Sequence, residues 1–226
     1  MTIGAIVQAR MSSVRLPGKV LLPLLGKPIL EYVLERVEHA RSIDRIVVAT
    51  SDETNDDPIY AFCQNRNVEC YRGSLDNVAQ RFLGVIDQHN FDAFARICAD
   101  SPFLDQRIVD KTVKMFRNGN YDMVANTLTR SFPKGQSVEV MGADIFRAGC
   151  GQMREHEDLE HVTRYFHNHR DQFNTCNISA KNDNSSIQLS VDTSDDFSVA
   201  EKILGAMDRP HWEYGLEGIL KIYRQL

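Results

Sequence analysis

The sequence predicts an α/β protein with a mainly parallel sheet that helices cover on both faces. Short apolar runs of the kind found in buried strands alternate with segments of helical periodicity, and this order is typical of βαβ units. The length of 226 residues fits one domain, 1–226, with a small insertion in its middle third. An apolar fraction of 42% and a charged fraction of 25% suffice for a packed core under a polar surface.

Five strands and four helices are predicted in the first 127 residues. The opening strand, IGAIVQA (3–9), is a continuous apolar run, which indicates a strand covered on both faces. The helix at 28–40 begins with a proline in its first turn and places five apolar side chains on one face. The other elements continue the alternation, with strands at 45–50, 68–72, 91–100 and 121–127 and helices at 58–65, 77–88 and 108–116.

The pattern is looser between about residues 127 and 180. A stretch with Pro and Gly precedes a strand at 137–141 and helices at 143–153 and 158–169, and we interpret this segment as an insertion or an interface. Its aromatic residues outside the regular pattern favour a role in a homodimer: Phe132, Phe146, Tyr165 and Phe166. A strand at 186–193 and two helices within 195–226 complete the predicted fold.

Charge and cysteine content exclude several classes of protein. A net charge of -5 disfavours a general nucleic-acid or membrane-surface binder, so any basic site must be local. Five cysteines, an odd number without a CxxC pair, indicate reduced thiols in a cytosolic protein. The sequence shows no signal-peptide pattern and no apolar run long enough for a membrane span, and we therefore expect a cytoplasmic location.

The stretch QARMSSVRLPGK gathers cations directly after the first strand. Arg10, Arg15 and Lys19 fall within ten residues, and the first acidic residue of the chain is Glu31. The loop from 10 to 27 has 18 residues, whereas connections of this kind usually have about 2 to 6. Arginine and lysine bind phosphate oxygens, and Gly18 lets the backbone come close to a ligand. A polyphosphate suits this set; the alternative is a solvated loop with scattered cations.

Other phosphate-binding motifs do not match this loop. The pattern GxxxxGK[ST] fails because Ser13 and Val20 stand at two of its required positions, and GxGxxG does not occur. A P-loop ATPase and a dinucleotide-dependent dehydrogenase are therefore disfavoured. Carboxylates instead follow several predicted strands, in SDETND, ADSPF and VDTSDD, and ligands of open parallel sheets bind beyond those strand ends.

The opening motif resembles that of the cytidylyltransferase branch of the nucleotidyltransferases. These include the enzymes that make CMP-activated acidic sugars and, in particular, the SpsF-type spore-coat polysaccharide proteins. The pattern AR-x-x-S-x-R-L-PGK of that family is present from Ala9 to Lys19. RGSLDNVAQRF, CADSPFLD, EHVTRYF and LSVDTSDDF resemble further family elements in the same order, with Asn77 and Ala99 replacing the usual Asp and Gly.

The resemblance implies a Rossmann-like fold of the nucleotide-diphospho-sugar transferase type. It also implies transfer of CMP from CTP to an acidic sugar or related small acceptor, a divalent metal such as Mg²⁺, and frequently a homodimer. In this scheme Arg10, Arg15 and Lys19 hold the triphosphate, and Asp100 and Asp192 bind the metal. The other implied contacts are Gln8, Ala9, Gly18, Arg72, Gly73 and Ser74 for the nucleotide, and Glu139 and His161 for the acceptor.

Alternatives remain for both the site residues and the activity. Asp100 suits a helix cap or a turn, Gly73 an ordinary turn and Glu139 a charge at a strand edge. We assign Asp196 to the N-terminus of a helix, and we interpret His156, His167 and His169 as surface or interface residues. Rival functions are a nucleotidyltransferase with another nucleotide or a non-sugar acceptor (a phosphonate or an alditol phosphate), and a non-catalytic nucleotide-binding regulator.

Overall fold

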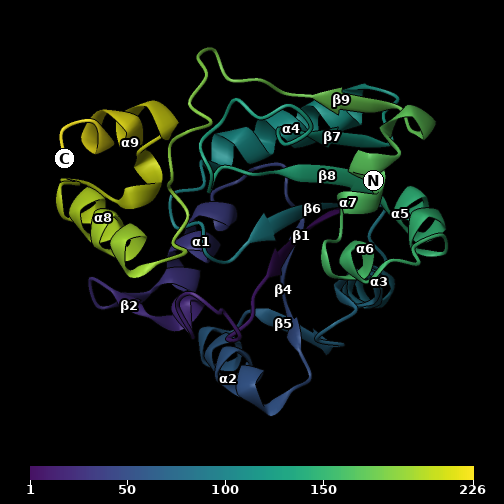
Figure 1. Cartoon of the computed structure of the whole chain (residues 1–226), viewed down its shortest axis with the longest axis horizontal. Helices are drawn as coiled ribbons and strands as arrows, with labels where there is room; N and C mark the ends of the chain where they lie inside the picture. The colour runs from purple at the N-terminus through teal and green to yellow at the C-terminus, as the bar shows by residue number, and fades with distance from the viewer.

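A seven-stranded sheet with the order β5-β4-β1-β6-β8-β7-β9 forms the centre of the computed structural model, which describes residues 1–226 (Figure 1). β8 runs antiparallel to both of its neighbours, and the other pairs are parallel. A separate hairpin of two short strands lies in the opening loop. The strands are β1 (Ile3–Gln8), β2 (Pro23–Leu24), β3 (Lys27–Pro28), β4 (Arg45–Ser51), β5 (Glu69–Gly73), β6 (Ala93–Cys98), β7 (Met123–Ala125), β8 (Glu139–Gly142) and β9 (Thr175–Asn177).

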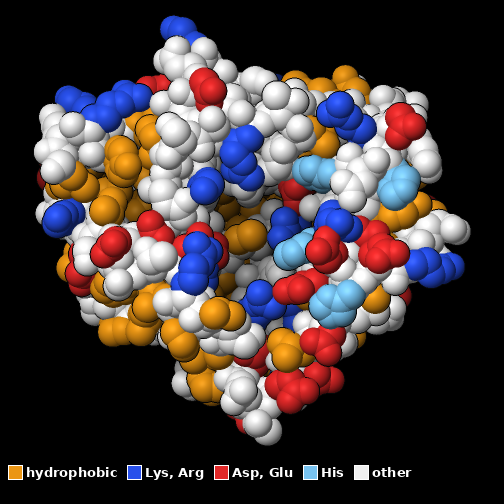
Figure 2. All heavy atoms as spheres, viewed as in Figure 1, with side chains coloured by type: hydrophobic (Ala, Val, Ile, Leu, Met, Phe, Trp, Pro, Cys, Tyr) orange, Lys and Arg blue, Asp and Glu red, His pale blue; other side chains and the backbone are white.

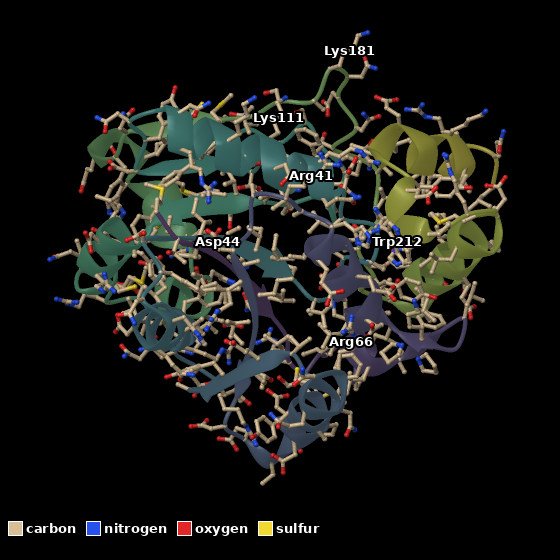
Figure 3. The ribbon with its side chains drawn as sticks, turned by 180° about the vertical axis from the view of Figure 1, so that it is seen from behind. Arg41, Asp44, Arg66, Lys111, Lys181 and Trp212 are labelled. Carbon is tan, nitrogen blue, oxygen red and sulfur yellow. The ribbon has the colours of Figure 1, made fainter.

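Helices cover both faces of this sheet, as predicted. The α-helices are α1 (Ile29–Glu38), α2 (Asp57–Arg66), α3 (Val78–His89), α4 (Gln106–Asn118), α5 (Ala143–Cys150), α6 (His156–Glu160), α7 (Arg164–Asn168), α8 (Ser194–Gly205) and α9 (Leu216–Tyr223). One core cluster packs α1, α2 and α4 against the sheet, and a second packs α3, α5 and α7 against its other face. Figure 3 shows the first of these faces, with Lys111 on α4 and Arg66 at the end of α2.

β1 shows how an apolar run becomes a strand with two buried faces. Ile3, Ala5 and Val7 belong to the first core cluster, whereas Ile6 belongs to the second. This division follows from the alternation of side chains along a strand. α8 and α9 lie outside both layers and form a third cluster with the hairpin and α1 at one edge of the molecule (Figure 1).

Two predicted elements differ in the structure. Residues 186–193 are not a strand of the sheet, because they form only an isolated bridge between Gln188 and Lys134. Leu189 and Val191 are apolar because they pack into the third core cluster, and not because they pair with a neighbouring strand. The predicted helix at 158–169 is two short helices, α6 and α7, since His161 has a non-helical backbone between them.

The segment 127–180 contributes β8 and β9 to the main sheet. Three of the four aromatic residues that suggested an interface are buried in the core of the chain itself: Phe146 and Phe166 are fully buried, and Phe132 is 7% exposed. These three side chains are therefore not available to a partner subunit, contrary to the expectation from the sequence. Among the helices of the structure, none is both long and apolar enough to cross a membrane.

Candidate active site

A polar cavity of about 380 Å³ opens at the carboxyl ends of β1 and β6. In Figure 2 it is the central hollow, with basic, acidic and histidine side chains around it. It brings together seven of the predicted site residues: Gln8, Arg10, Arg15, Lys19, Asp100, His161 and Asp192. The remaining lining residues are Ser13, Val14, Val20, Arg96, Cys98 and Ala99.

The start of the cationic loop is anchored by a buried carboxylate. Asp56 accepts a hydrogen bond of 2.7 Å from the Met11 backbone N–H, and it accepts others from Thr50 and Ser51. Burial would raise the pKa of Asp56, but these hydrogen bonds outweigh it and lower the pKa. This acid of the SDETND cluster therefore holds the loop in place and does not line the cavity.

Gly18 gives the loop its turn toward the cavity. Its φ of 70° is left-handed, a conformation that glycine adopts without strain. Its N–H donates to the Met11 carbonyl at 2.9 Å, so this group is already used inside the protein. The short 3₁₀ helix Lys19–Leu21 begins at the next residue and directs the lysine inward.

Lys19 lies between the two predicted metal-binding carboxylates. Its Nζ is 2.6 Å from Asp100 Oδ2 and 2.8 Å from Asp192 Oδ1, and Lys19 is only 8% exposed. Arg15 adds a contact of 3.1 Å to the same oxygen of Asp192. Burial alone would lower the pKa of Lys19, but the two carboxylates outweigh it and raise the pKa.

Two sets of hydrogen bonds hold the backbone around Asp192 in this position. The Val191 N–H donates to the Asp100 carbonyl at 2.9 Å, which joins the two acidic segments directly. Asp196 and Thr193 form a capping box at the start of α8, and Asp196 also accepts from the Asp192 N–H at 3.0 Å. Asp196 thus lies at the helix N-terminus, where the sequence places it.

The donor set fits a hard cation such as Mg²⁺. Asp100 and Asp192 reach one ammonium group, so their oxygens lie no farther apart than the sum of two hydrogen-bond lengths. No cluster of three or more His, Cys, Asp or Glu side chains capable of holding a metal occurs in the chain. This matches Mg²⁺, which often uses one or two carboxylates and completes its shell with water and substrate phosphates.

The residue that follows α6 lies beside the cationic loop and lines the cavity. Arg10 donates to Glu160 at 3.2 Å, and His161 lines the cavity beside it. Because Arg10 is held in an ion pair in this structure, a phosphate would compete with Glu160 for its guanidinium group. The EHVT segment therefore lies next to the cationic loop, although 150 positions separate Arg10 from Glu160.

Glu139 lies beneath the cavity and not on its wall. Its side chain is 4% exposed and accepts four hydrogen bonds of 2.6 to 2.9 Å, from Thr127, His167, Arg96 and Thr163. Burial would raise the pKa of Glu139, but these donors, His167 and Arg96 foremost, lower it strongly. His167 thus contributes to this network while its side chain stays 27% exposed, so it is a partly buried residue at the surface.

Sequence reasoning missed Arg96, which lines the cavity. Its signal was present: ARIC places one arginine in the middle of an otherwise apolar strand, and a charge buried in this way needs a partner. The partner is Glu139, which stands opposite Arg96 in the antiparallel pair of β6 and β8.

Five predicted nucleotide contacts lie outside the cavity lining or face other partners. Arg72 donates to the carbonyls of Ser51 and Glu53 and pairs with Asp57 at 2.7 Å. A Cβ on Gly73 would meet the side chains of Tyr71 and Arg81, which gives this glycine a packing role. Ser74 accepts from the Asn77 N–H, Ala9 is buried at 2% exposure, and the N–H of Gly18 is used by Met11.

A cationic loop beside paired carboxylates, at the carboxyl edge of a mainly parallel sheet, suits the binding of a nucleotide polyphosphate. Comparison with known proteins agrees. The model of a family described as cytidylyltransferase matches residues 4–208, and the chain belongs to this family. It is accordingly an enzyme of the nucleotidyltransferase class.

Three similar proteins illustrate the relationship. The spore coat polysaccharide biosynthesis protein SpsF of Bacillus subtilis is 35% identical over 174 residues, which cover 73% of this chain and 69% of SpsF. An uncharacterized protein of Methanocaldococcus jannaschii is 32% identical over 201 residues, covering 88% of this chain and 82% of that protein. The structure of a cytidylyltransferase from Leptospira borgpetersenii serovar Hardjo-bovis superposes with a TM-score of 0.95 at 26% identity, covering 100% of this chain and 94% of that one.

Proposed function

We propose that this cytidylyltransferase transfers CMP from CTP to an acidic sugar or a related small acceptor, with release of pyrophosphate. The observation that carries the proposal is the convergence of Lys19, Asp100 and Asp192 at the edge of the cavity, with Arg15 beside them. The family supports the cytidylyl donor, and the polysaccharide pathway named for SpsF supports a sugar acceptor.

The reaction needs positioning and neutralisation of charge more than covalent catalysis. A hydroxyl oxygen of the acceptor attacks the α-phosphorus, and the bond from that phosphorus to the bridging oxygen breaks as pyrophosphate leaves. Arg10, Arg15 and Lys19 carry the positive charge that would hold the triphosphate oxygens while negative charge develops. Asp100 and Asp192 would hold Mg²⁺, which when bound orients the phosphates and offsets their charge.

The order of the strands suggests where the two substrates lie. β4 and β5 flank β1 on one side, and β6 and β8 flank it on the other. We place the nucleoside toward Gln8 and the end of β5, near Arg72 to Ser74. The acceptor then lies over β6 beside His161, and the triphosphate lies between them at Lys19. The carboxylates at the strand ends thus stand where the two substrates meet.

A release assay tests this function. Purified protein is mixed with Mg²⁺, each of the four ribonucleoside triphosphates and a panel of sugar acids, neutral sugars and alditol phosphates, and pyrophosphate is measured. We expect release with CTP and a sugar acid. Thermal shifts with the same nucleotides give a second readout, since a ligand at 100 times its Kd stabilises by about 2.7 kcal/mol. Stabilisation by a different triphosphate alone contradicts the cytidylyl assignment.

We also propose that the enzyme is a homodimer. Three of the aromatic residues that suggested an interface are buried in the monomer core, so support now comes from the family resemblance and from the half-buried Tyr165. Light scattering at micromolar protein concentration is expected to give twice the chain mass of 25.7 kDa. A mass equal to one chain would refute the dimer without affecting the proposed activity.

A further inference from the structure

The arginine in the middle of β6 is held in a fixed orientation by buried groups. Arg96 Nη1 donates to Glu139 Oε2 at 2.8 Å, while Nε and Nη2 both reach Gln8 Oε1 at 3.3 Å. Glu139 is fixed in turn by two threonines and by His167 on α7. This network joins β1, β6 and β8 to the helix that follows EHVT. A guanidinium group held on three sides is pre-organised for recognition.

Part of this guanidinium remains open to a ligand. Arginine has five N–H groups, and three of those on Arg96 have a protein acceptor. One N–H on each terminal nitrogen is therefore free of a protein partner. The side chain is 20% exposed, and Arg96 is among the residues that line the cavity. A planar fork with two free donors suits a carboxylate or phosphate.

Arg96 stands on the side of the cavity where we place the acceptor. Arg96 and Cys98 alternate along β6, so their side chains project from the same face, and Asp100 follows in the turn after the strand. All three line the cavity. β6 lies between β1 and β8, so Arg96 reaches Gln8 on one side and Glu139 on the other. The nucleoside, as placed above, lies beyond Gln8 toward β4 and β5.

We propose that Arg96 binds the carboxylate of the acceptor and that Glu139 is the positioning residue that holds it. This assignment rests on the proposed function, and it makes a sugar with a carboxylate near the attacking hydroxyl the preferred class of acceptor. Glu139 then acts through Arg96 and does not touch the acceptor itself. The alternative is that Arg96 only neutralises the buried charge of Glu139.

The test compares binding of two probes, CMP and CMP-N-acetylneuraminate, by isothermal titration calorimetry. The second probe carries a sugar carboxylate on the carbon that bears the phosphate, and its CMP part anchors it in the site. We expect wild type to bind it more tightly than CMP. Arg96→Met should remove about tenfold to a hundredfold of that difference, the range for hydrogen bonds to charged groups.

Further variants separate recognition from folding. Arg96→Met alone leaves the buried charge of Glu139 without its partner. The double variant Arg96→Met/Glu139→Gln therefore removes both charges. Melting temperatures are recorded for the single and the double variant. Glu139→Gln alone should also lower the difference between the probes. Arg45→Met is the matched control, because it removes an exposed arginine at the start of β4.

A probe difference that survives in both Arg96 variants, or equal affinities of the two probes in wild type, overturns the assignment. An equal loss of affinity for both probes also overturns it, because Arg96 would then serve the nucleotide phosphate. Failure of wild type to bind CMP or CTP would refute the proposed function instead, so the two failures are distinguishable.

Discussion

Lys19→Ala and Arg15→Ala should each lower kcat/KM for CTP by about a hundredfold to a thousandfold while the chain stays folded. Loss of one preorganised donor aimed at developing negative charge typically has an effect of this size. Lys19 is the more informative position, because its Nζ contacts Asp100 and Asp192 together. Its removal takes away a phosphate contact and leaves two neighbouring carboxylates without their shared cation.

Pyrophosphate release at fixed Mg²⁺ and varied CTP measures this effect. Lys27→Ala is a matched control, because Lys27 belongs to the same loop but pairs with Glu35 at 2.7 Å and does not line the cavity. Its turnover should stay close to that of wild type. Melting temperatures report on folding for all three variants. Near-normal turnover of both Arg15→Ala and Lys19→Ala would remove the triphosphate assignment.

Local patterns were sufficient to predict the frame of this site. The short apolar run at 3–9 indicated a strand and the helical periodicity at 28–40 indicated a helix, and both are present within two residues of the expected bounds. The excess of cations after the first strand marked a loop whose Arg10, Arg15 and Lys19 line the cavity. Parallel strands end at the same edge of a sheet. The strand order therefore predicts that Asp100, which follows β6, lies close to the opening loop, which follows β1.

The sequence could not show contacts between distant segments, because these depend on the direction in which each side chain points. The pair of Arg96 and Glu139 requires the register of β6 against β8, and nothing local specifies an antiparallel strand at that place. The contact between His167 and Glu139 joins α7 to β8, and no local pattern in the sequence indicates it. The apolar alternation of residues 186–193 has two explanations that the sequence cannot separate. It can come from pairing in a sheet or from packing of alternate side chains beside α8.

The second large expected effect is a loss of turnover when either carboxylate of the pair is removed. Asp100→Asn and Asp192→Asn should each reduce turnover about a hundredfold, because asparagine keeps the shape of the side chain and loses the charge that a hard cation requires. Lys19 is bound to both carboxylates, so a metal ion must share them with it or displace it. We therefore expect Mn²⁺ alone, used as a spectroscopic substitute for Mg²⁺, to bind weakly, and CTP to strengthen its binding.

Electron paramagnetic resonance of Mn²⁺ measures this binding without any turnover. In wild type the fraction of bound Mn²⁺ should rise when CTP is added, and each aspartate variant should lose most of that rise because only one carboxylate then holds the ion together with the phosphates. Asp195→Asn is the matched control, since Asp195 is exposed in the first turn of the same helix and lies outside the cavity lining. If both variants keep the rise seen in wild type, the ion is held by CTP or by other residues. Asp100 and Asp192 would then be counter-ions of Lys19, and their effect on turnover would come through the lysine.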